Sequence, residues 1–216
     1  MRAVLLALVL LAFVAGCGGG GGESSGDTTA TTDTCEQVDA PAPRDAGNHT
    51  APKAPLDAGK SYALVFETSC GSFTVALDLE SAPHTAASLV ALAEDGYFDD
   101  TIFHRVAPGF VIQGGDPTQT GAGGPGYSTV DKPPANATYP KGTFAMAKAE
   151  TEPPGTSGSQ FFVITGDGVT LPPDYAIVGE VTEGMDTIDR IDGLGVADGV
   201  PPSQPIVVDR VTVETS

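Results

Sequence analysis

The alternation of apolar and polar positions predicts that the chain is mainly β. Phe73, Val75 and Leu77 fall on every second position between mostly polar residues, which is the period of a strand with one buried face. Residues 62–68 also have the composition of a strand, and the short link at 69–71 indicates a hairpin between the two. Further short strands are expected at residues 101–105, 111–115, 142–147, 160–165, 175–181 and 206–213.

Two stretches have the period of a helix instead. Within residues 82–96, apolar residues recur at i, i+3, i+4 and i+7 from Ala86, which gives a helix one buried stripe. Pro83 suits the first turn of this helix and Gly96 suits its end. A second helix is expected at residues 184–191. Many short strands with one helix near each end favour a β-barrel whose openings are covered by helices.

The N-terminus predicts an export signal. Arg2 gives a short positive start, and residues 3–14 are apolar without a break, a run too short to span a bilayer but suited to a secretory signal. The run ends in Val-Ala-Gly-Cys at 14–17, which resembles the lipobox of bacterial lipoproteins. Residues 1–16 are therefore predicted to be a lipoprotein signal peptide and Cys17 the lipidated residue. The alternative is an ordinary signal peptide that contains a cysteine.

Residues 17–60 are predicted to be a flexible tether. Residues 18–34 consist mostly of Gly, Ser, Thr, Asp and Glu, and residues 40–60 are rich in Pro and Ala and are expected to be irregular, since neither segment has enough apolar surface to bury. Two acyl chains on Cys17 would suffice for stable anchoring. The folded domain, residues 61–216, is then expected at the outer face of a bacterial cytoplasmic membrane.

Two cysteines remain beyond the lipobox, Cys35 and Cys70. Disulfides persist in exported proteins, so these cysteines are predicted to pair and to join the end of the tether to the start of the domain. The alternative is two free, partly buried thiols.

The charge balance bears on partners. Asp and Glu number 28 against 10 Lys and Arg, which gives a formal net charge of −18. Such a surface repels phosphate backbones, so nucleic acid is not expected as a partner. The acidity is otherwise typical of a soluble surface, and the chain is expected to be a monomer.

The stretch with the most candidate chemistry is Phe-His-Arg-Val-Ala-Pro-Gly-Phe-Val-Ile-Gln-Gly-Gly-Asp at residues 103–116. It resembles the signature of the cyclophilins. Two further blocks, 144–147 with 158–162 and 171–179 with 183–185, follow in the order and spacing of that family. The resemblance implies a closed eight-stranded antiparallel β-barrel capped by two helices. It also implies peptidyl-prolyl cis/trans isomerase activity, here on proline-containing exported polypeptides.

The residues of this stretch can form a site. Arg105 and Gln113 can lie side by side if their strands form a hairpin, while alternation turns Ile112 toward the core. A glutamine carbonyl can hold a guanidinium, and that guanidinium can donate a hydrogen bond to the imide nitrogen of a twisted X–Pro bond. This chemistry requires no nucleophile, metal or cofactor.

The resemblance assigns roles to these residues. It implies that Arg105 is the catalytic residue and that Gln113 positions it. It implies the following peptide-binding residues: Phe110, Val111, Phe162 and Leu171 around a proline pocket, Tyr175 at its rim, and Ala147, Lys148 and Gln160 along the peptide chain.

Some residues depart from the family's common pattern. Lys148 stands where eukaryotic cyclophilins often have Asn, and Thr170 and Tyr175 stand where they often have Trp and His. The missing Trp puts tight binding of cyclosporin-type ligands in doubt, but not isomerisation. The alternative function is a tethered proline-peptide binding or chaperone module with little catalytic role.

Two other features are expected to be structural. Gly121–Gly126 formally matches a dinucleotide-binding loop, but Pro125 interrupts it and no helical pattern follows, so a surface loop is expected. His104 is expected to be a packed structural residue rather than a general base.

Overall fold

The hairpin expected at the start of the domain is present. The computed structural model describes residues 34–197 and 200–216. In it, β1 (Tyr62–Thr68) pairs antiparallel with β2 (Gly71–Leu77). Phe66 lies opposite Phe73, and their buried rings stack with centroids 4.6 Å apart. The alternation seen in the sequence therefore sets which face of β2 meets the core.

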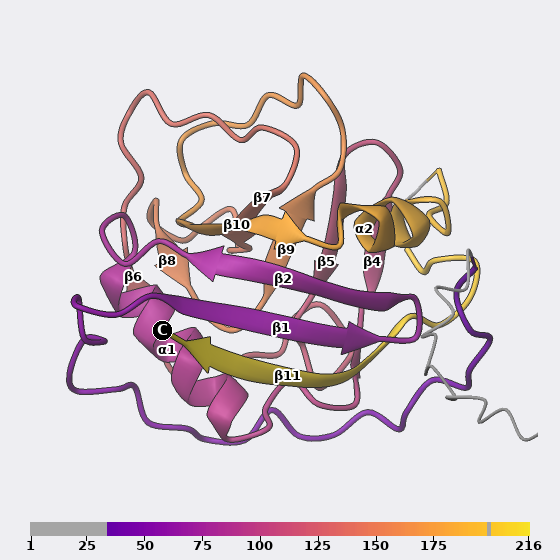
Figure 1. The fold of residues 1–216 in the computed structure, drawn as a ribbon, viewed down its shortest axis with the longest axis horizontal. Coiled ribbons are helices and arrows are strands. Elements are labelled where there is room, and N and C mark those ends of the chain that lie inside the picture. The colour runs from indigo at the N-terminus through magenta and orange to yellow at the C-terminus, as the bar shows by residue number, and fades with distance from the viewer. Residues whose placement is uncertain (1–33, 198–199) are drawn as a thin grey trace, which may run out of the picture. The chain divides into compact units, whose positions relative to one another are not determined.

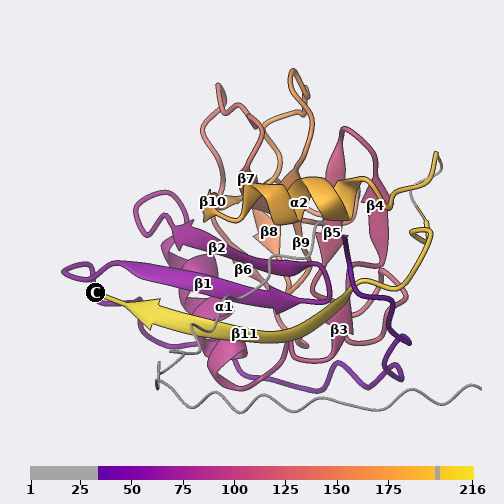
Figure 2. The same cartoon turned by 45° about the vertical axis from the view of Figure 1, so that its right-hand side comes forward.

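The other strands extend this hairpin into one curled antiparallel sheet, which Figures 1 and 2 show from two directions. Nine strands lie in the order β3-β11-β1-β2-β10-β7-β9-β5-β4. The added strands are β3 (Thr101–Ile102), β4 (Arg105–Ala107), β5 (Val111–Gly114), β7 (Thr143–Met146), β9 (Phe161–Ile164), β10 (Ile177–Glu183) and β11 (Val207–Thr215). A separate two-stranded sheet pairs β6 (Thr129–Val130) with β8 (Thr156–Ser157).

The two ends of the sheet order, β3 and β4, are only two residues apart in the chain. The sheet must therefore curl until its edges approach each other, which gives a mainly β fold of the expected kind. The single strand expected at 101–105 is divided, because β3 pairs with β11 whereas β4 pairs with β5. The pairing thus joins nine strands rather than eight, and within the described residues none of it joins β3 to β4.

Apolar side chains fill the inside of the curl, and two helices cover it. The ring of Phe161 lies 4.8–6.0 Å, centroid to centroid, from those of Phe66, Phe103 and Phe144. The helices α1 (Pro83–Glu94) and α2 (Met185–Asp192) add buried side chains to this core. They lie apart in Figure 1, α1 near β11 and α2 near β2. Both expected helices are confirmed.

We call residues 34–60 the N-terminal arm. The arm has no helix or strand, as expected. It nevertheless lies on the domain, and in Figure 1 it follows the lower border of the ribbon in indigo and purple. The predicted disulfide between Cys35 and Cys70 fixes its start to the turn of the β1–β2 hairpin, and Leu56 packs against the core. The arm is thus irregular in structure but bound to the domain.

The predicted signal peptide (1–16), Cys17 and the predicted tether up to residue 33 lie outside the described residues. Within the described ranges, no helix is both long and apolar enough to cross a bilayer.

Candidate active site

Strand register brings the expected site residues onto one outer face of the sheet. Arg105 of β4 lies opposite Gln113 of β5, and Gln113 lies opposite Phe162 of β9. On the other face, Ile112 is fully buried in the core. The hairpin and the alternation predicted from the sequence are both confirmed, and they place the guanidinium outside the sheet rather than inside the curl.

A relay of hydrogen bonds fixes the arginine. Arg105 Nη1 donates to Gln113 Oε1 at 3.3 Å, and Gln113 Nε2 donates to Gln160 Oε1 at 3.1 Å. Gln160 Nε2 in turn donates to the carbonyl of Gly123 at 2.9 Å. Each amide presents its oxygen toward the arginine and its nitrogen toward the Gly123 loop, so rotating either amide would break two bonds.

The guanidinium also lies against an apolar wall. Arg105 Cζ is 5.7 Å from the centroid of the Phe110 ring, a distance at which a cation is attracted to the face of an aromatic ring. None of the ion pairs among the described residues involves Arg105. With one Nη bonded to an amide and no carboxylate to neutralise it, the arginine keeps N–H groups for a ligand.

A cavity of about 190 Å³ lies beside this arginine. It is lined by Arg105, Phe110, Val111, Gln113, Ala147, Lys148, Phe162, Leu171 and Tyr175. The structure thus gathers every residue expected at the site except Gln160. We call this space the first cavity.

Tyr139 was not predicted from the sequence, and it holds the backbone of Tyr175, which lines the first cavity. Its hydroxyl donates to the carbonyl of Tyr175 at 2.9 Å and accepts from the Tyr175 amide at 3.2 Å. Tyr175 packs edge-on against Phe162, with ring centroids 5.4 Å apart. Tyr139 lies in a stretch without regular periodicity, so its buried position could not be read from the pattern.

A second cavity of about 750 Å³ adjoins the first. The two share Gln113, Ala147 and Lys148, and the missing site residue, Gln160, lines the second. Its remaining wall consists of residues 121–128, residues 158–159, Ala149 and Glu152. The glycine-rich segment expected to be a plain surface loop is therefore one wall of the groove.

Asp116 holds that glycine-rich loop together. Its carboxylate is fully buried and accepts hydrogen bonds from the amides of Thr118, Gly121 and Gly123 at 2.8–3.1 Å. Burial raises the pKa of Asp116, but these bonds, with one from the Thr118 hydroxyl, outweigh it and lower the pKa overall. Gly123 approaches so closely that a Cβ there would lie 2.0 Å from Asp116 Oδ1. The sequence signal for this ordered loop was an aspartate followed within a few residues by several glycines.

His104 lies under the same loop, as the structural role expected for it requires. It is 8 % exposed, lines neither cavity, and has no hydrogen-bond partner for either ring nitrogen within the described part of the chain. Burial disfavours the charged imidazolium and so lowers the pKa of His104.

Asp192, at the end of α2, holds the turn that carries Phe110. Its carboxylate accepts from the Gly109 amide at 3.0 and 3.1 Å and from the Thr165 hydroxyl at 2.6 Å. The Thr165 amide then donates to the carbonyl of Phe110 at 3.0 Å. Sequence reasoning missed Asp192, because 83 residues separate it from Gly109.

Known proteins share both this sequence and this fold. The family model for the cyclophilin-type peptidyl-prolyl cis-trans isomerases matches residues 63–213. This chain belongs to the cyclophilin family. The probable peptidyl-prolyl cis-trans isomerase A of Mycobacterium leprae is 37% identical to this cyclophilin over 172 residues, which are 71% of this chain and 93% of the relative. The peptidyl-prolyl cis-trans isomerase A of Mycobacterium tuberculosis is 35% identical over 164 residues, which cover 68% and 88% of the two chains.

Solved structures agree. A cyclophilin-type isomerase from Cryptosporidium parvum superposes with a TM-score of 0.66 at 29% identity, covering 71% of this chain and 98% of that one. A crystal structure of that protein in the presence of the dipeptide Ala-Pro gives a TM-score of 0.64 at 30% identity, covering 70% and 98%. This cyclophilin is therefore a peptidyl-prolyl cis-trans isomerase, and its N-terminal arm precedes the residues that the family shares.

Proposed function

We propose that Arg105 is the catalytic residue of this isomerase and that Gln113 positions it. When an X–Pro bond twists, the imide nitrogen loses resonance and becomes a pyramidal acceptor. The guanidinium, held at one Nη by Gln113, has free N–H groups to donate to that nitrogen. The supporting observation is an arginine that is fixed by an amide beside the apolar walls of the first cavity and forms no ion pair with a carboxylate among the described residues.

The energies indicate that Arg105 does not act alone. Uncatalysed X–Pro exchange takes on the order of 10–100 s, so turnover in milliseconds needs about 10⁴-fold, or roughly 5–6 kcal/mol. A hydrogen bond from a charged donor contributes about 1.5–3 kcal/mol. The remainder must come from fixing the proline ring and excluding water, and Phe110, Val111, Phe162 and Leu171 supply the apolar walls for both.

We propose that the peptide runs from the first cavity into the second. The Ala-Pro dipeptide used with the Cryptosporidium relative supports a proline-containing substrate. Ala147 and Lys148 line both cavities, so a chain that leaves the proline pocket passes along their backbone toward Gln160. The nine-stranded curled sheet would correspond to the closed eight-stranded barrel of the family if β3 and β4 together count as one strand. We also propose that the enzyme acts as a monomer.

We propose further that the enzyme is exported and carries lipid at Cys17. The apolar run at 3–14, the small residues before Cys17 and the disulfide between Cys35 and Cys70 support an exported protein. In a bacterium with lipoprotein processing, the full chain should incorporate a tagged fatty acid and sediment with membranes. Cys17→Ser should abolish both; retained label in that variant would overturn the anchor.

A protease-coupled assay on a short Ala-Pro peptide tests the proposed mechanism. Arg105→Ala should lower kcat/KM by about 10- to 150-fold, the loss of one charged hydrogen bond. Arg105→Lys keeps the charge but not the planar fork and should recover only part of the activity. Peptide binding, followed by NMR titration, should change less than turnover. Full turnover in Arg105→Ala would overturn the mechanism and favour a role in peptide binding.

A further inference from the structure

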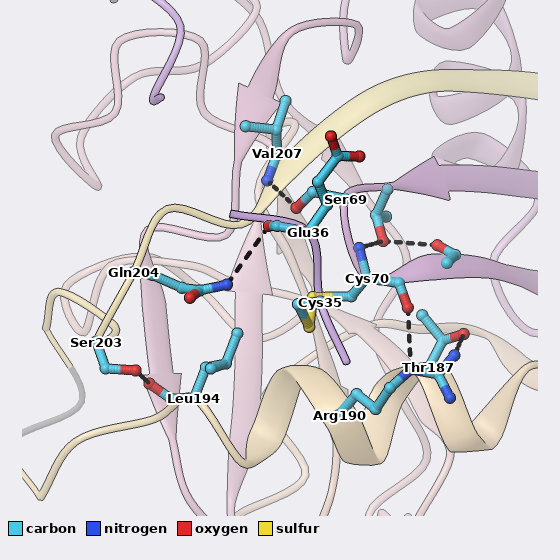
Figure 3. Close-up of a disulfide and its surroundings, with 12 residues drawn as sticks. Cys35, Glu36, Ser69, Cys70, Thr187, Arg190, Leu194, Ser203, Gln204 and Val207 are labelled. Atoms are coloured by element: carbon cyan, nitrogen blue, oxygen red, sulfur yellow. Dashed lines mark hydrogen bonds between the residues drawn. A yellow bond between two sulfur atoms is a disulfide. The ribbon is translucent and has the colours of Figure 1, made fainter. Parts of the chain in front are cut away.

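The N-terminal arm lies before the residues that match the cyclophilin family, yet it makes specific contacts with the domain. Figure 3 shows its start, where Cys35 is joined to Cys70 close to α2. The Glu36 amide donates to the carbonyl of Ser69 at 2.7 Å, and Arg190 Nε of α2 donates to the carbonyl of Cys70 at 3.0 Å. The arm is thus fixed to the β1–β2 turn by the disulfide and by one backbone hydrogen bond, and Arg190 ties that turn to α2.

Arg44 fixes the middle of the arm to the end of α1. Its Nη2 donates to the carbonyls of Tyr97 and Asp99, the latter at 2.9 Å. Its Cζ lies 5.9 Å from the centroid of the Tyr97 ring. A guanidinium has several N–H donors and can therefore hold both carbonyls of this turn at once.

From that point the arm reaches the glycine-rich loop that forms a wall of the second cavity. The Arg44 amide donates to the carbonyl of Pro117 at 3.0 Å, and the His49 amide donates to the carbonyl of Pro125 at 2.8 Å. In the other direction, Gln119 Nε2 donates to the carbonyl of Pro41 at 2.8 Å. Three hydrogen bonds therefore hold this loop from outside, on both sides of Gly121 and Gly123.

A second path runs through Tyr97, which is 2% exposed beneath the arm. The His49 ring packs edge-on against it, with centroids 5.0 Å apart. The Tyr97 hydroxyl lies 3.1 Å from the hydroxyl of Ser159, which lines the second cavity and bonds the carbonyl of Gly115 at 2.7 Å. The arm thus supports two walls of the same cavity.

We propose that residues 41–49 of the arm are a positioning element of the substrate groove. They hold the loop of residues 117–126 in place, so that the second cavity keeps its shape and Gln160 keeps its bond to Gly123. The arm acts mainly on peptide residues beyond the X–Pro unit, and it reaches Arg105 only through the far end of the relay, the Gln160–Gly123 bond. This role rests on the proposed path of the peptide through both cavities.

Kinetics on substrates of two lengths test the proposal in the full chain. The short substrate is a capped Ala-Pro peptide confined to the first cavity, and the long ones extend it by three residues on either side. Arg44→Ala should lower kcat/KM about three- to tenfold for a long substrate, the size of effect expected from coupled neighbours. The short substrate should change less than twofold. An equal loss on both substrates, or none on either, would overturn the role.

Lys53→Ala is the matched control. It removes the same charge from the same arm, but Lys53 is exposed and makes no hydrogen bond or ion pair within the described residues. It should leave both substrates unchanged. Gln119→Ala removes a loop contact without altering the arm and should act in the same direction as Arg44→Ala, more weakly.

Amide hydrogen exchange separates this role from the proposed peptide path. In Arg44→Ala, and not in Lys53→Ala, the amides of Gly121 and Gly123 should exchange severalfold faster. Unchanged exchange would show that the arm does not hold the loop and would overturn the proposal. Faster exchange with unchanged long-substrate kinetics would overturn it as well, by showing that the loop does not serve the peptide. If wild type acts on short and long substrates equally, the proposed path itself fails.

Discussion

The two cavities of the groove are built in different ways. The first cavity rests on β5 and β9, whose paired strands carry Val111 and Phe162 from the buried sheet into its floor. The second cavity is walled largely by a loop, whose shape depends on the buried Asp116 and on hydrogen bonds to the arm. A sheet is held by many cooperative bonds, whereas a loop is held by a few, so the second cavity should be the easier one to loosen.

The largest effect should come from a change in the first cavity. Phe110→Ala removes the ring that faces both the first cavity and Arg105. Loss of that apolar surface should reduce transition-state binding by about 2–3 kcal/mol, which lowers kcat/KM roughly 30- to 150-fold. Because every substrate must place its proline there, short and long peptides should lose equally. Phe110→Leu keeps an apolar wall and should lose less. A loss confined to long peptides would contradict the division between the two cavities.

A smaller effect is expected from a change in the loop that walls the second cavity. Gly123→Ala places a Cβ 2.0 Å from Asp116 Oδ1, so the loop must shift and the bond from Gln160 weakens. Long substrates should lose about tenfold in kcat/KM, equivalent to roughly 1.4 kcal/mol. Short substrates should lose less, because the loop acts on them only through the Gln160–Gln113 relay. Gly124→Ala is the stability control, since nothing lies within 4 Å of a Cβ there. Only Gly123→Ala should lower the thermal midpoint; equal midpoints would show that the loop tolerates the shift.

The first cavity could be predicted from the sequence, whereas the contacts that hold the loop of the second cavity could not. Alternation placed Ile112 inside and Gln113 outside, because strand period and register are local properties that a pattern can carry. The resemblance to the cyclophilins, carried by three sequence blocks, then assigned nine residues that line the first cavity. Asp192 and Tyr139 were missed because their contacts join segments far apart in the chain. The contacts between Arg44 and the Pro117 loop were missed for the same reason, and because an arm rich in Pro and Ala looks the same whether or not it is bound.

Asp192 tests the turn that carries Phe110 into the first cavity. Asp192→Ala frees the Gly109 amide and the Thr165 hydroxyl, so the turn that carries Phe110 should become less ordered. KM should rise about three- to tenfold, the cost of roughly one net hydrogen bond, while kcat changes less because Arg105 is untouched. The control is Asp189→Ala on the same helix, whose carboxylate pairs only with Lys141 in the described structure. If kcat falls and KM does not, Asp192 acts on Arg105 rather than on the pocket.

The smallest effect on turnover should come from the protonation of His104, which acts on folding stability beneath the loop of the second cavity. Burial lowers the pKa of His104 in the folded protein below its ordinary value of 6.5; nearby Asp116 opposes this and Arg105 reinforces it. Well above pH 6.5 the imidazole of His104 is neutral in both the folded and the unfolded chain, so its titration does not change the free energy of unfolding. As the pH falls below 6.5, the unfolded chain binds the proton first, and stability is lost at up to about 1.4 kcal/mol per pH unit.

Urea unfolding of wild type and His104→Gln between pH 7.5 and 5 measures this term as a difference, which removes the contribution of groups the two proteins share. The free energy of unfolding of wild type should fall more steeply with decreasing pH than that of His104→Gln. Since His104 lies under the loop of Gly121, the loop should be the region that responds first, and the amides of Gly121 and Gly123 should exchange faster at pH 5.5 than those of β5 and β9 after correction for intrinsic rates. Equal slopes in the two proteins would mean that the folded state accommodates the charged imidazole at no cost, and the loop-built wall would then be more adaptable than its hydrogen bonds indicate.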